Sequence, residues 1–524
     1  MKKLTAIILA GLMFLSLAAC GGTGGKTLSG EVSYDIPEGK VIPDDAVLDV
    51  MTASYASWPY DENWAVWKYI KEAIGGTVNV TAVPSTEFGT KFTLIMAAPD
   101  NLPDVIGFVN RPATFSSYCE QGAFVAFDDY EEFLPDYNKF WNEIDEEYKW
   151  LKEMQRGIDG KVYFTPIYGM ERSKNLRAWL YRKDIFDKHG IEVPETLDEL
   201  YVAGKKLKEL YPESYPFCMR NGMGHINSIG STWKPNFHYN IYYDFENEKW
   251  SYGAADSEIM LQVIEFFKKM YDEQLIPKDY FTISASSWQE LVTTGRGFIF
   301  PDYQIRMDFF NGLARPNIPE FNLTAMKPPH ADNGVGIPMV NKFNLDPSGM
   351  AVANTGDAAS IANAWRYINW FYSDEGSEII SWGKEGETFE EVNGKKKFIY
   401  PDGSNNAQIL YGFQTTGAYA RIDPEAAEAN MSAEQAATTD FLLEYTYPEL
   451  DPTQYLNFTA DERTQVSDCN TTLGTFVKEN IQKFIIGQRP LTEWDAFQEE
   501  LKTLPVEELI SIYDTAYQRA KAFR

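Results

Sequence analysis

Short apolar runs with the alternation of β-strands are interleaved along most of the chain with helical patterns. Residues 47–51, 78–82 and 104–108 have the spacing and the β-branched content of strands. Stripes in which apolar residues recur every three or four positions begin at Trp64, Leu197, Met260, Ile361, Trp494 and Leu509. Thr196 and Glu199 flank the start of one stripe as a capping box. The alternation predicts an α/β architecture, with a mostly helical last hundred residues.

The first twenty residues have the layout of a secretory signal peptide. Lys2 and Lys3 precede an uncharged, almost wholly apolar stretch, and Leu-Ala-Ala-Cys ends it at Cys20. That ending resembles the bacterial lipobox, in which the cysteine is lipidated and becomes the mature N-terminus. The alternatives are an ordinary signal peptide with an incidental cysteine or a transmembrane helix, but the apolar run is short for a span of about 20 residues.

Residues 21–44 are rich in Gly, Ser and Pro, which predicts a flexible tether. Within it, Gly25-Lys26-Thr27 looks like the end of a phosphate-binding loop. The position that should carry the first glycine of that loop is Cys20, and no strand of the mature protein would precede it. Nucleotide binding is therefore rejected at this segment.

The length and charge of the chain narrow its class. A chain of 524 residues should divide into about two to four domains. The formal charge is −29, and removal of Lys2 and Lys3 leaves 45 basic against 76 acidic residues, a net charge of −31. Such a surface repels nucleic-acid phosphates and anionic lipid heads, so we expect no nucleic-acid partner. With 44% apolar and 15% aromatic residues, the acidic chain is expected to fold.

Three further cysteines, Cys119, Cys218 and Cys469, lie about a hundred residues or more apart. No close spacing indicates a metal cluster or a disulfide framework, although one bridge is possible. We expect buried free thiols, and neither a metal nor a cofactor.

An ordered series of segments carries a resemblance to a known family. The matching stretches are residues 92–98 with 102–106 (Leu-Pro-Asp-Val-Ile), 121–127 (Gln-Gly-Ala-Phe-Val-Ala-Phe), 159–163 (Asp-Gly-Lys-Val-Tyr), 180–184 with 190–196, and 484–494 with Tyr513. Their order and spacing resemble the extracellular solute-binding proteins, family 1, of carbohydrate ABC importers, and within them the long LplA/LipO-like lipoproteins.

This resemblance implies a two-lobed α/β clamp of the periplasmic-binding-protein type (type II), with a helical C-terminal extension and three hinge crossings near 167–178, 299–304 and 346–352. The N-terminal lobe would hold residues 45–167 plus 304–346, and the C-terminal lobe 168–303 plus 347–524. The ligand would lie between the lobes. Some long relatives carry a calcium loop, but residues 211–217 lack the spaced oxygen ligands, so we expect no calcium there.

A sugar site needs flat aromatic faces, surrounded by polar side chains that meet the hydroxyl groups. An Arg fork can pair with hydroxyls or with a uronate carboxylate. The expected ligand-binding residues lie after strands, at crossings or in an aromatic loop, and they are Trp58, Tyr60, Asn110, Arg111, Tyr168, Arg172, Trp233, Tyr239, Asp302, Tyr303 and Trp382. Loop packing for Trp58 and Tyr60, a surface salt bridge for Asn110-Arg111 and core packing for Trp382 remain alternatives.

The resemblance implies a non-enzymatic binding lipoprotein. It would capture a carbohydrate, which we expect to be an oligosaccharide, and deliver it to ABC permease subunits with an ATPase behind them. Lipid on Cys20 would anchor a monomer at the extracytoplasmic face of the bacterial cytoplasmic membrane. No Gly-x-Ser-x-Gly or His-Glu-x-x-His motif occurs, and the four histidines are scattered. The alternatives are a secreted glycoside hydrolase with two facing carboxylates, or a peptide or lipid binder on the same clamp.

Overall fold

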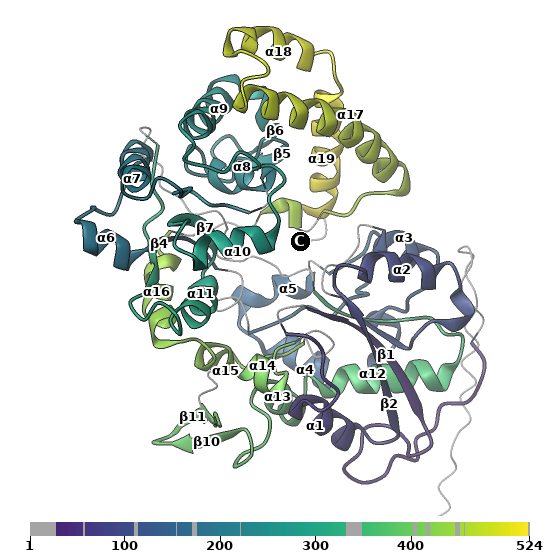
Figure 1. Ribbon diagram of the computed structural model, residues 1–524. Helices are drawn as coiled ribbons and strands as arrows, with labels where there is room; N and C mark the ends of the chain where they lie inside the picture. Colours follow the sequence, from purple (N-terminus) through teal and green to yellow (C-terminus); the bar gives the residue numbers. More distant parts are fainter. Residues whose placement is uncertain are drawn as a thin grey trace, which may run out of the picture.

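The computed structural model describes residues 28–55, 58–108, 114–153, 155–169, 176–220, 222–331, 348–401, 406–415, 420–445, 451–454 and 456–521. These residues form two α/β lobes, each with its own sheet and its own hydrophobic packing (Figure 1). Among the helices of these ranges, none combines the length and the apolar character needed to cross a membrane.

The first lobe is built on a four-stranded sheet in the order β2-β1-β3-β9. Strands β1 (Val47–Ser54), β2 (Thr77–Pro84) and β3 (Val105–Phe108) are parallel, and β9 (Gly349–Val352) runs antiparallel beside β3. Both faces are covered, as parallel strands require. One face packs with α1 (Ala65–Ile74), α4 (Pro135–Glu143), α12 (Ala358–Trp370) and α13 (Asp374–Ser381), and the other with α2 (Phe88–Met96) and α3 (Phe115–Glu120).

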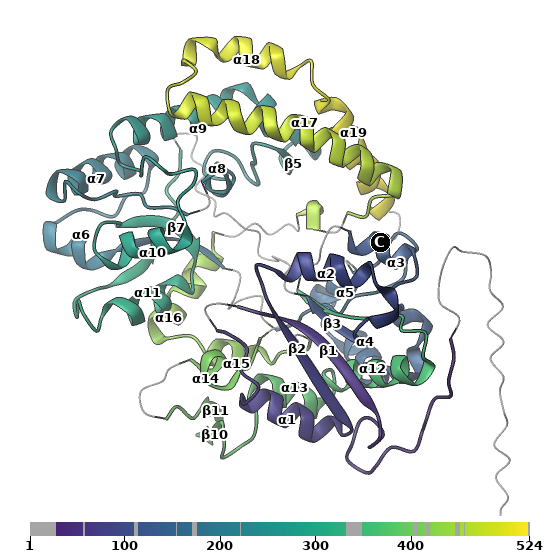
Figure 2. The ribbon, with the colours of Figure 1, turned by 45° about the vertical axis from the view of Figure 1, so that its right-hand side comes forward.

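The second lobe is built on a three-stranded antiparallel sheet, in which β4 (Arg177–Arg182) lies between β7 (Ile299–Tyr303) and β8 (Leu323–Met326). The helices that pack around it include α6 (Lys183–His189), α7 (Leu197–Leu210), α8 (Met223–Gly230), α9 (Ser257–Asp272), α10 (Ala285–Thr293), α11 (Arg306–Ala314) and α16 (Ala433–Leu443). The C-terminal helices α17 (Ala460–Ile485), α18 (Trp494–Leu501) and α19 (Val506–Lys521) lie over this lobe (Figure 2).

Smaller elements complete the fold. The hairpin β5 (Ile241–Asp244)–β6 (Lys249–Tyr252) contacts α19, whereas β10 (Phe389–Val392)–β11 (Lys395–Phe398) contacts α15 (Pro424–Ala429). Two short helices remain: α5 (Trp150–Glu153) precedes β4 in the chain, and α14 (Ala407–Tyr411) follows β11.

Most elements read from local patterns are confirmed. The three predicted strands are β1, β2 and β3, and α7 begins with the predicted capping box, in which the Glu199 N–H donates to Thr196 Oγ1 at 3.1 Å. Every apolar residue predicted for the α9 stripe is buried. Cys119, Cys218 and Cys469 are buried free thiols, as expected.

The assignment of segments to lobes needs correction. The core residues show that the chain crosses between Ile167 and Leu176, between Ala331 and Met350, and between Ala427 and Leu442. The crossing expected near 167–178 agrees with the first of these, and the one expected near 346–352 overlaps the end of the second, whereas the third was missed. Residues 304–346 were expected in the N-terminal lobe, but β8 pairs with β4 in the second lobe. Residues from 347 onward were expected in the C-terminal lobe, but β9 pairs with β3 in the first. Residues 299–304 are therefore a sheet strand and its end, not a crossing.

The expected tether is also corrected over its described part, residues 28–44. The Ser29 N–H donates to the Gly356 carbonyl at 2.8 Å, and Arg366 donates to the Ser33 carbonyl at 2.9 Å. Ile42 is fully buried in the first lobe. Burial of Ile42 and these two hydrogen bonds hold the segment against the lobe, so Gly and Pro content alone was a poor guide.

The first crossing begins beside the segment that leads to the third. The Tyr168 N–H donates to the Ala420 carbonyl, and the Ile422 N–H donates to the Tyr168 carbonyl, each at 2.9 Å. Gly169 has φ +91°, and a Cβ atom there would lie 1.9 Å from the Ile422 carbonyl oxygen. This close approach requires glycine for both its conformation and its lack of a side chain.

We expect Gly169→Ala to destabilise the protein more than Gly160→Ala does. Both glycines have positive φ, +91° and +79°, but nothing lies within 4 Å of a Cβ built on Gly160. The shared conformational cost is about 1–2 kcal/mol, and crowding against Ile422 adds about 1–3 kcal/mol. Urea unfolding followed by tryptophan fluorescence measures the difference. Equal losses in the two variants would show that the two segments are not held this closely.

Candidate functional site

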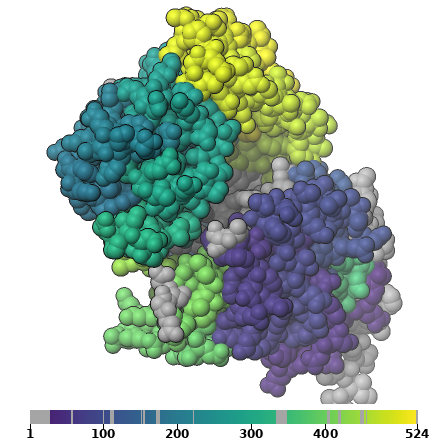
Figure 3. Space-filling view, viewed as in Figure 1, coloured from purple at the N-terminus to yellow at the C-terminus, as the bar shows by residue number. Residues whose placement is uncertain are grey.

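Two sheet edges approach each other where the chain crosses between the lobes. In the first lobe, the parallel strands β1 and β3 have their carboxyl ends at the same edge of the sheet. After β1 the chain adds β2 on one side and then β3 on the other, so the strand order reverses between β1 and β3. Ligands of open α/β sheets bind outside such carboxyl ends. In the second lobe, β4 starts directly after the first crossing, and the end of β7 lies beside that start. The space-filling view is hollowed between the lobes (Figure 3).

Trp58 and Tyr60 follow β1 at the first-lobe edge, as expected. Trp58 is half-buried, and its ring packs against Tyr55 with centroids 5.3 Å apart. The Tyr60 N–H donates to Ser54 Oγ at 2.9 Å, and the Tyr60 ring packs against Trp64 and Trp67. Burial, helped by Glu62 and Asp61, raises the pKa of Tyr60 to about 12, so its hydroxyl stays protonated. Both rings are thus positioned by the end of the strand.

Asp302 and Tyr303 end β7 at the opposite edge. The Asp302 side chain is fully buried, and Arg220 donates to it through Nε at 2.6 Å and Nη2 at 2.8 Å. Tyr303 is half-buried, and the Arg177 guanidinium lies 3.5 Å from its ring centroid. The two residues therefore differ in role, because Asp302 is enclosed by arginines whereas Tyr303 forms part of a stacked pair.

Sequence reasoning missed the arginines at this edge. Arg177 opens β4, Arg220 precedes α8, and Arg306 begins α11. All three lie within 4.0 Å of the Asp302 carboxylate. Burial raises the pKa of Asp302, but the Arg220 hydrogen bonds and the nearby charges outweigh that effect and hold this pKa below its usual value. The only signal was that Arg177 and Asp302 each lie within a predicted crossing, 167–178 and 299–304.

His225 lies beneath this edge in α8. Its Nε2 lies 3.0 Å from the Pro301 carbonyl oxygen, so Nε2 carries the proton and donates. Burial lowers the pKa of His225 to about 4, a shift that the Pro301 hydrogen bond and Asp302 oppose and that Arg177 and Arg220 support. The imidazole is neutral at physiological pH.

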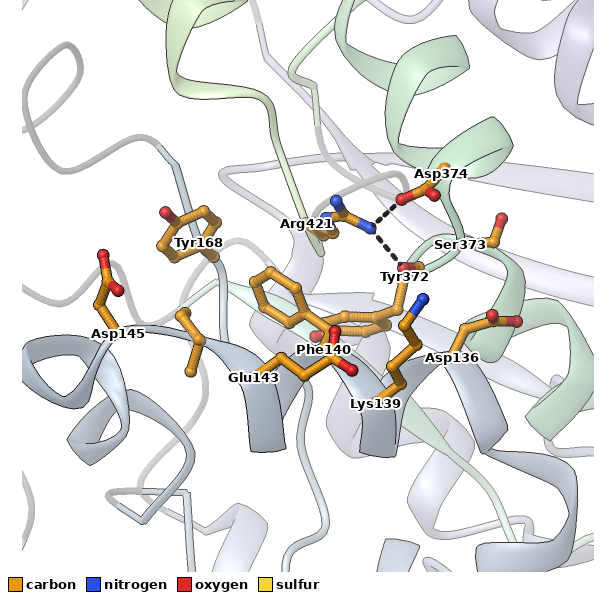
Figure 4. Close-up of a pocket in the computed structure, with 11 residues that line it drawn as sticks. Asp136, Lys139, Phe140, Glu143, Asp145, Tyr168, Tyr372, Ser373, Asp374 and Arg421 are labelled. Carbon is orange, nitrogen blue, oxygen red and sulfur yellow. Dashed lines mark hydrogen bonds and ion pairs between the residues drawn. The ribbon is translucent and has the colours of Figure 1, made fainter.

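Tyr168 lies at the first crossing, where a polar cavity of about 320 Å³ opens beside it (Figure 4). Its ring packs against Phe140 and Tyr148, with centroids 5.2 and 5.4 Å away. Arg421 donates to the Tyr372 carbonyl at 3.0 Å and to Asp374 at 2.9 Å, so it fixes the segment that pairs with Tyr168. The cavity is lined by α4, the start of α13 and these two crossing segments, so Tyr168 is placed at the hinge.

Three expected ligand residues are core residues. Trp233 and Tyr239 are 4% and 5% exposed within the second lobe, and the Trp233 ring packs against Phe266. Trp382 is 1% exposed in the first lobe, where its indole N–H donates to Asp423 at 2.7 Å. The alternative of core packing fits Trp382, and burial leaves none of the three a free face for stacking. Asn110, Arg111, Arg172 and Cys20 lie outside the described residues.

A family model described as "Bacterial extracellular solute-binding protein" matches residues 60–378, more than half of the chain. The chain therefore belongs to the bacterial extracellular solute-binding protein family, and the predicted resemblance is confirmed. Members of this family are binding components of transport systems rather than enzymes, which agrees with the expectation of a non-enzymatic protein.

Curated relatives match part of the chain. Lipoprotein LipO of Bacillus subtilis is 30% identical over 251 residues, which are 45% of this chain and 46% of LipO. The polygalacturonan/rhamnogalacturonan-binding protein YtcQ of the same organism is 26% identical over 300 residues, 54% of this chain and 53% of YtcQ. The matches thus span about half the length of these relatives.

Solved structures share the fold over almost the whole chain. The alginate-binding protein AlgQ2, crystallised without calcium ion, has a TM-score of 0.73 at 22% identity and covers 92% of this chain and 99% of its own. The substrate-binding protein FusA of Streptococcus pneumoniae, in complex with kestose, has a TM-score of 0.72 at 17% identity and covers 91% and 100%. The expected α/β fold of the periplasmic-binding-protein type is confirmed.

We expect the unfolding free energy to fall as the pH drops from about 6.5 to about 4, in part through His225. Because the folded-state pKa is depressed, the unfolded chain binds a proton in this window that the folded chain does not. The slope is about 1.4 kcal/mol per pH unit and the total about 3 kcal/mol. This contribution of His225, and not the part of the slope that comes from other groups, should vanish in His225→Gln, which keeps a donor for the Pro301 carbonyl.

The measurement is urea unfolding at several pH values for wild type, His225→Gln and His330→Gln. His330 is a half-buried histidine of the same lobe and serves as the matched control. An unchanged pH slope in His225→Gln would contradict the assignment of a buried neutral imidazole.

Proposed function

We propose that the protein captures an oligosaccharide between its lobes and delivers it to the permease of an ABC importer. The observation that carries this proposal is the placement of Trp58 at the first-lobe edge and of the Tyr303–Arg177 stack at the second-lobe edge, with the crossings between them. Aromatic faces suit the C–H faces of sugar rings, and guanidinium donors suit their oxygens. The complex of FusA with kestose, the alginate-binding protein AlgQ2 and the polygalacturonan/rhamnogalacturonan-binding protein YtcQ support a carbohydrate as ligand.

The proposed mechanism is that of a type II clamp, in which the lobes rotate about the three crossings and close on the ligand. Ligand contacts to both edges would favour the closed arrangement over the open one, because only the closed form makes both sets of contacts. Domain closure would then present a changed surface to the permease. The paired segments at Tyr168 and Ile422 are the proposed axis.

The alternative of a glycoside hydrolase finds little support at this site. An acid–base pair needs a carboxylic acid whose pKa is raised. Asp302 is the buried carboxylate at the second-lobe edge, and its arginine partners lower its pKa instead. Among the described residues of this edge it is thus suited to hold cations in place, not to donate a proton.

Binding is tested by thermal unfolding in the presence of neutral and acidic oligosaccharides and of short peptides. A ligand at a hundred times its dissociation constant adds about 2.7 kcal/mol to the folded state. We expect a saccharide to raise the unfolding temperature and to be recovered intact. Release of shorter products would support the hydrolase, and stabilisation by peptides alone would support a peptide binder; either result would contradict the proposal.

Trp58→Ala and Tyr303→Ala should each weaken saccharide binding by up to roughly tenfold without unfolding the protein, because each removes a stacking face. Calorimetric titration measures the affinity. Tyr34→Ala is the matched control, since Tyr34 is 69% exposed and packs beside Phe133, away from both edges. If both variants bind as wild type does, the site has been placed wrongly.

We further propose that lipid on Cys20 anchors the mature protein at the extracytoplasmic face of the bacterial cytoplasmic membrane. Expressed in a bacterium with labelled palmitate, wild type should carry the label and sediment with membranes. Cys20→Ser should lose both properties, since it lacks the thiol, whereas Cys119→Ser should keep them. Label retained in Cys20→Ser would refute the anchor.

A further inference from the structure

Three guanidinium groups of the second lobe converge on one carboxylate. Arg220 holds Asp302 through two hydrogen bonds of 2.6 and 2.8 Å. Arg306 Nε lies 3.7 Å and Arg177 Nη1 4.0 Å from Asp302 Oδ1. The Tyr303 backbone N–H also donates to Oδ1, at 2.7 Å. Asp302 therefore holds three guanidinium groups close together, although their like charges repel one another.

The charges in this cluster do not balance. Among the described residues, three guanidinium groups face one carboxylate, which leaves an excess of two positive charges. Among the described groups that act on Arg220 and Arg306, Asp302 is the only carboxylate. His225, directly beneath, is neutral at physiological pH. In a chain of formal charge −29, a cationic excess that is not matched by nearby acids stands apart from the rest of the surface.

The cluster also has unused hydrogen-bond donors. Arg220 uses Nε and Nη2 on Asp302, but Arg306 makes no hydrogen bond to a described residue, and its Nε is buried without one. Arg177 stacks on Tyr303 and reaches Asp302 only at 4.0 Å. Buried donors are normally satisfied, so the buried Nε of Arg306, beside the partly exposed Arg177, is available to an acceptor from outside the protein.

The position of the cluster makes it reachable from the space between the lobes. Arg177 is the second described residue after the first crossing, and it pairs with Tyr303 at the end of β7. The side chains of Arg177 and Arg306 are 23% and 20% exposed. Arg306 and Arg220 lie over the fully buried ring of Trp288, and Arg177 lies over the ring of Tyr303. The cluster thus has an apolar floor and an open side, which suits a partly desolvated ion pair.

We propose that Arg177 and Arg306 bind the carboxylate of an acidic sugar, so that the ligand is an oligosaccharide containing uronic acid. The inference rests on the proposed function and names the chemical class of its ligand. A carboxylate accepts two parallel N–H bonds from a guanidinium fork and neutralises excess charge, which a hydroxyl group does not. Asp302 is a positioning residue that holds the arginines together, and Tyr303 offers an adjoining aromatic face.

The first test uses the unmodified protein and three trisaccharides: trigalacturonic acid, its fully methyl-esterified form and galactotriose. Calorimetric titration at low and high salt gives each affinity. We expect the acid to bind roughly ten- to a hundredfold more tightly than the ester, since hydrogen bonds to charged groups are worth about twice those between neutral groups. This advantage should shrink at high salt.

The second test compares Arg177→Gln, Arg306→Gln and the matched control Arg315→Gln. Arg315 lies at the other end of α11, where it pairs with exposed Glu434. Each of the first two variants should lose roughly tenfold or more of its affinity for the acid and little for the ester or galactotriose. Arg315→Gln should bind all three as wild type does, and thermal unfolding confirms that every variant is folded.

The outcomes separate this inference from the proposed function. If wild type binds the acid and the ester equally, or if Arg177→Gln and Arg306→Gln weaken both equally, the arginines do not recognise a carboxylate and the inference is overturned, although saccharide capture stands. If wild type binds none of the three trisaccharides, and oligomers of mannuronate and galactose tested in the same way fail to bind as well, the inference and the proposed function are both contradicted.

Discussion

The structure depends on the backbone pairing where the chain passes between its lobes. Tyr168 exchanges hydrogen bonds with Ala420 and Ile422, and Gly169 allows the two segments to touch. Each lobe is completed by a strand that arrives after a crossing, β9 in the first and β4 in the second. The crossings therefore connect the two lobes and also fix which ends of the two sheets face each other. Rotation about such short paired segments changes the gap between the sheets without disturbing either core.

The second constraint is the cost of a buried charge. A buried carboxylate is tolerated only when it is paired and hydrogen-bonded, and Arg220 alone meets that need for Asp302. Asp302 does not need Arg177 and Arg306 for its neutralisation. They carry a desolvation cost of their own, visible in the lowered pKa of Arg306. Side chains that are costly to the folded state, and whose charge is not balanced among the described residues, are typical of binding sites rather than of stabilising cores.

Local patterns in the sequence determine elements but not partners. The capping box at Thr196 and the stripe of α9 can be read within one or two helical turns, so both were predictable. The four-residue strands β8 and β9 carry no local mark of the sheet that they join, and their exchange between lobes is a matter of long-range pairing. For the same reason the order of the family's segments identified the fold correctly, while the crossing expected at 299–304 was wrong and the one between Ala427 and Leu442 was missed.

The candidate site shows the same limit more sharply. Trp58 was chosen because it follows a predicted strand and Tyr303 because it lies at a predicted crossing, whereas Trp233, Tyr239 and Trp382 have the same chemistry and lie in the cores. Aromatic residues occur both in cores and at binding sites, and the fold decides which of them are exposed.

The arginine cluster brings together residues that are separated by up to 129 positions, from Arg177 to Arg306, around an aspartate that looked like a ligand residue. No spacing rule describes such a set, because it exists only once β4, β7 and α11 are assembled.

The overall charge and the local charge act over different distances, which is why an acidic protein can receive an acidic ligand. At physiological salt the Debye length is about 8 Å, so the dispersed surface carboxylates repel a ligand only weakly beyond that range. The guanidinium groups of Arg177 and Arg306 are less than a quarter exposed, and their field is screened less by solvent. A ligand that reaches the space between the lobes is therefore governed by the nearest few charges. The excess charge of this cluster is positive, and an anionic ligand would neutralise it.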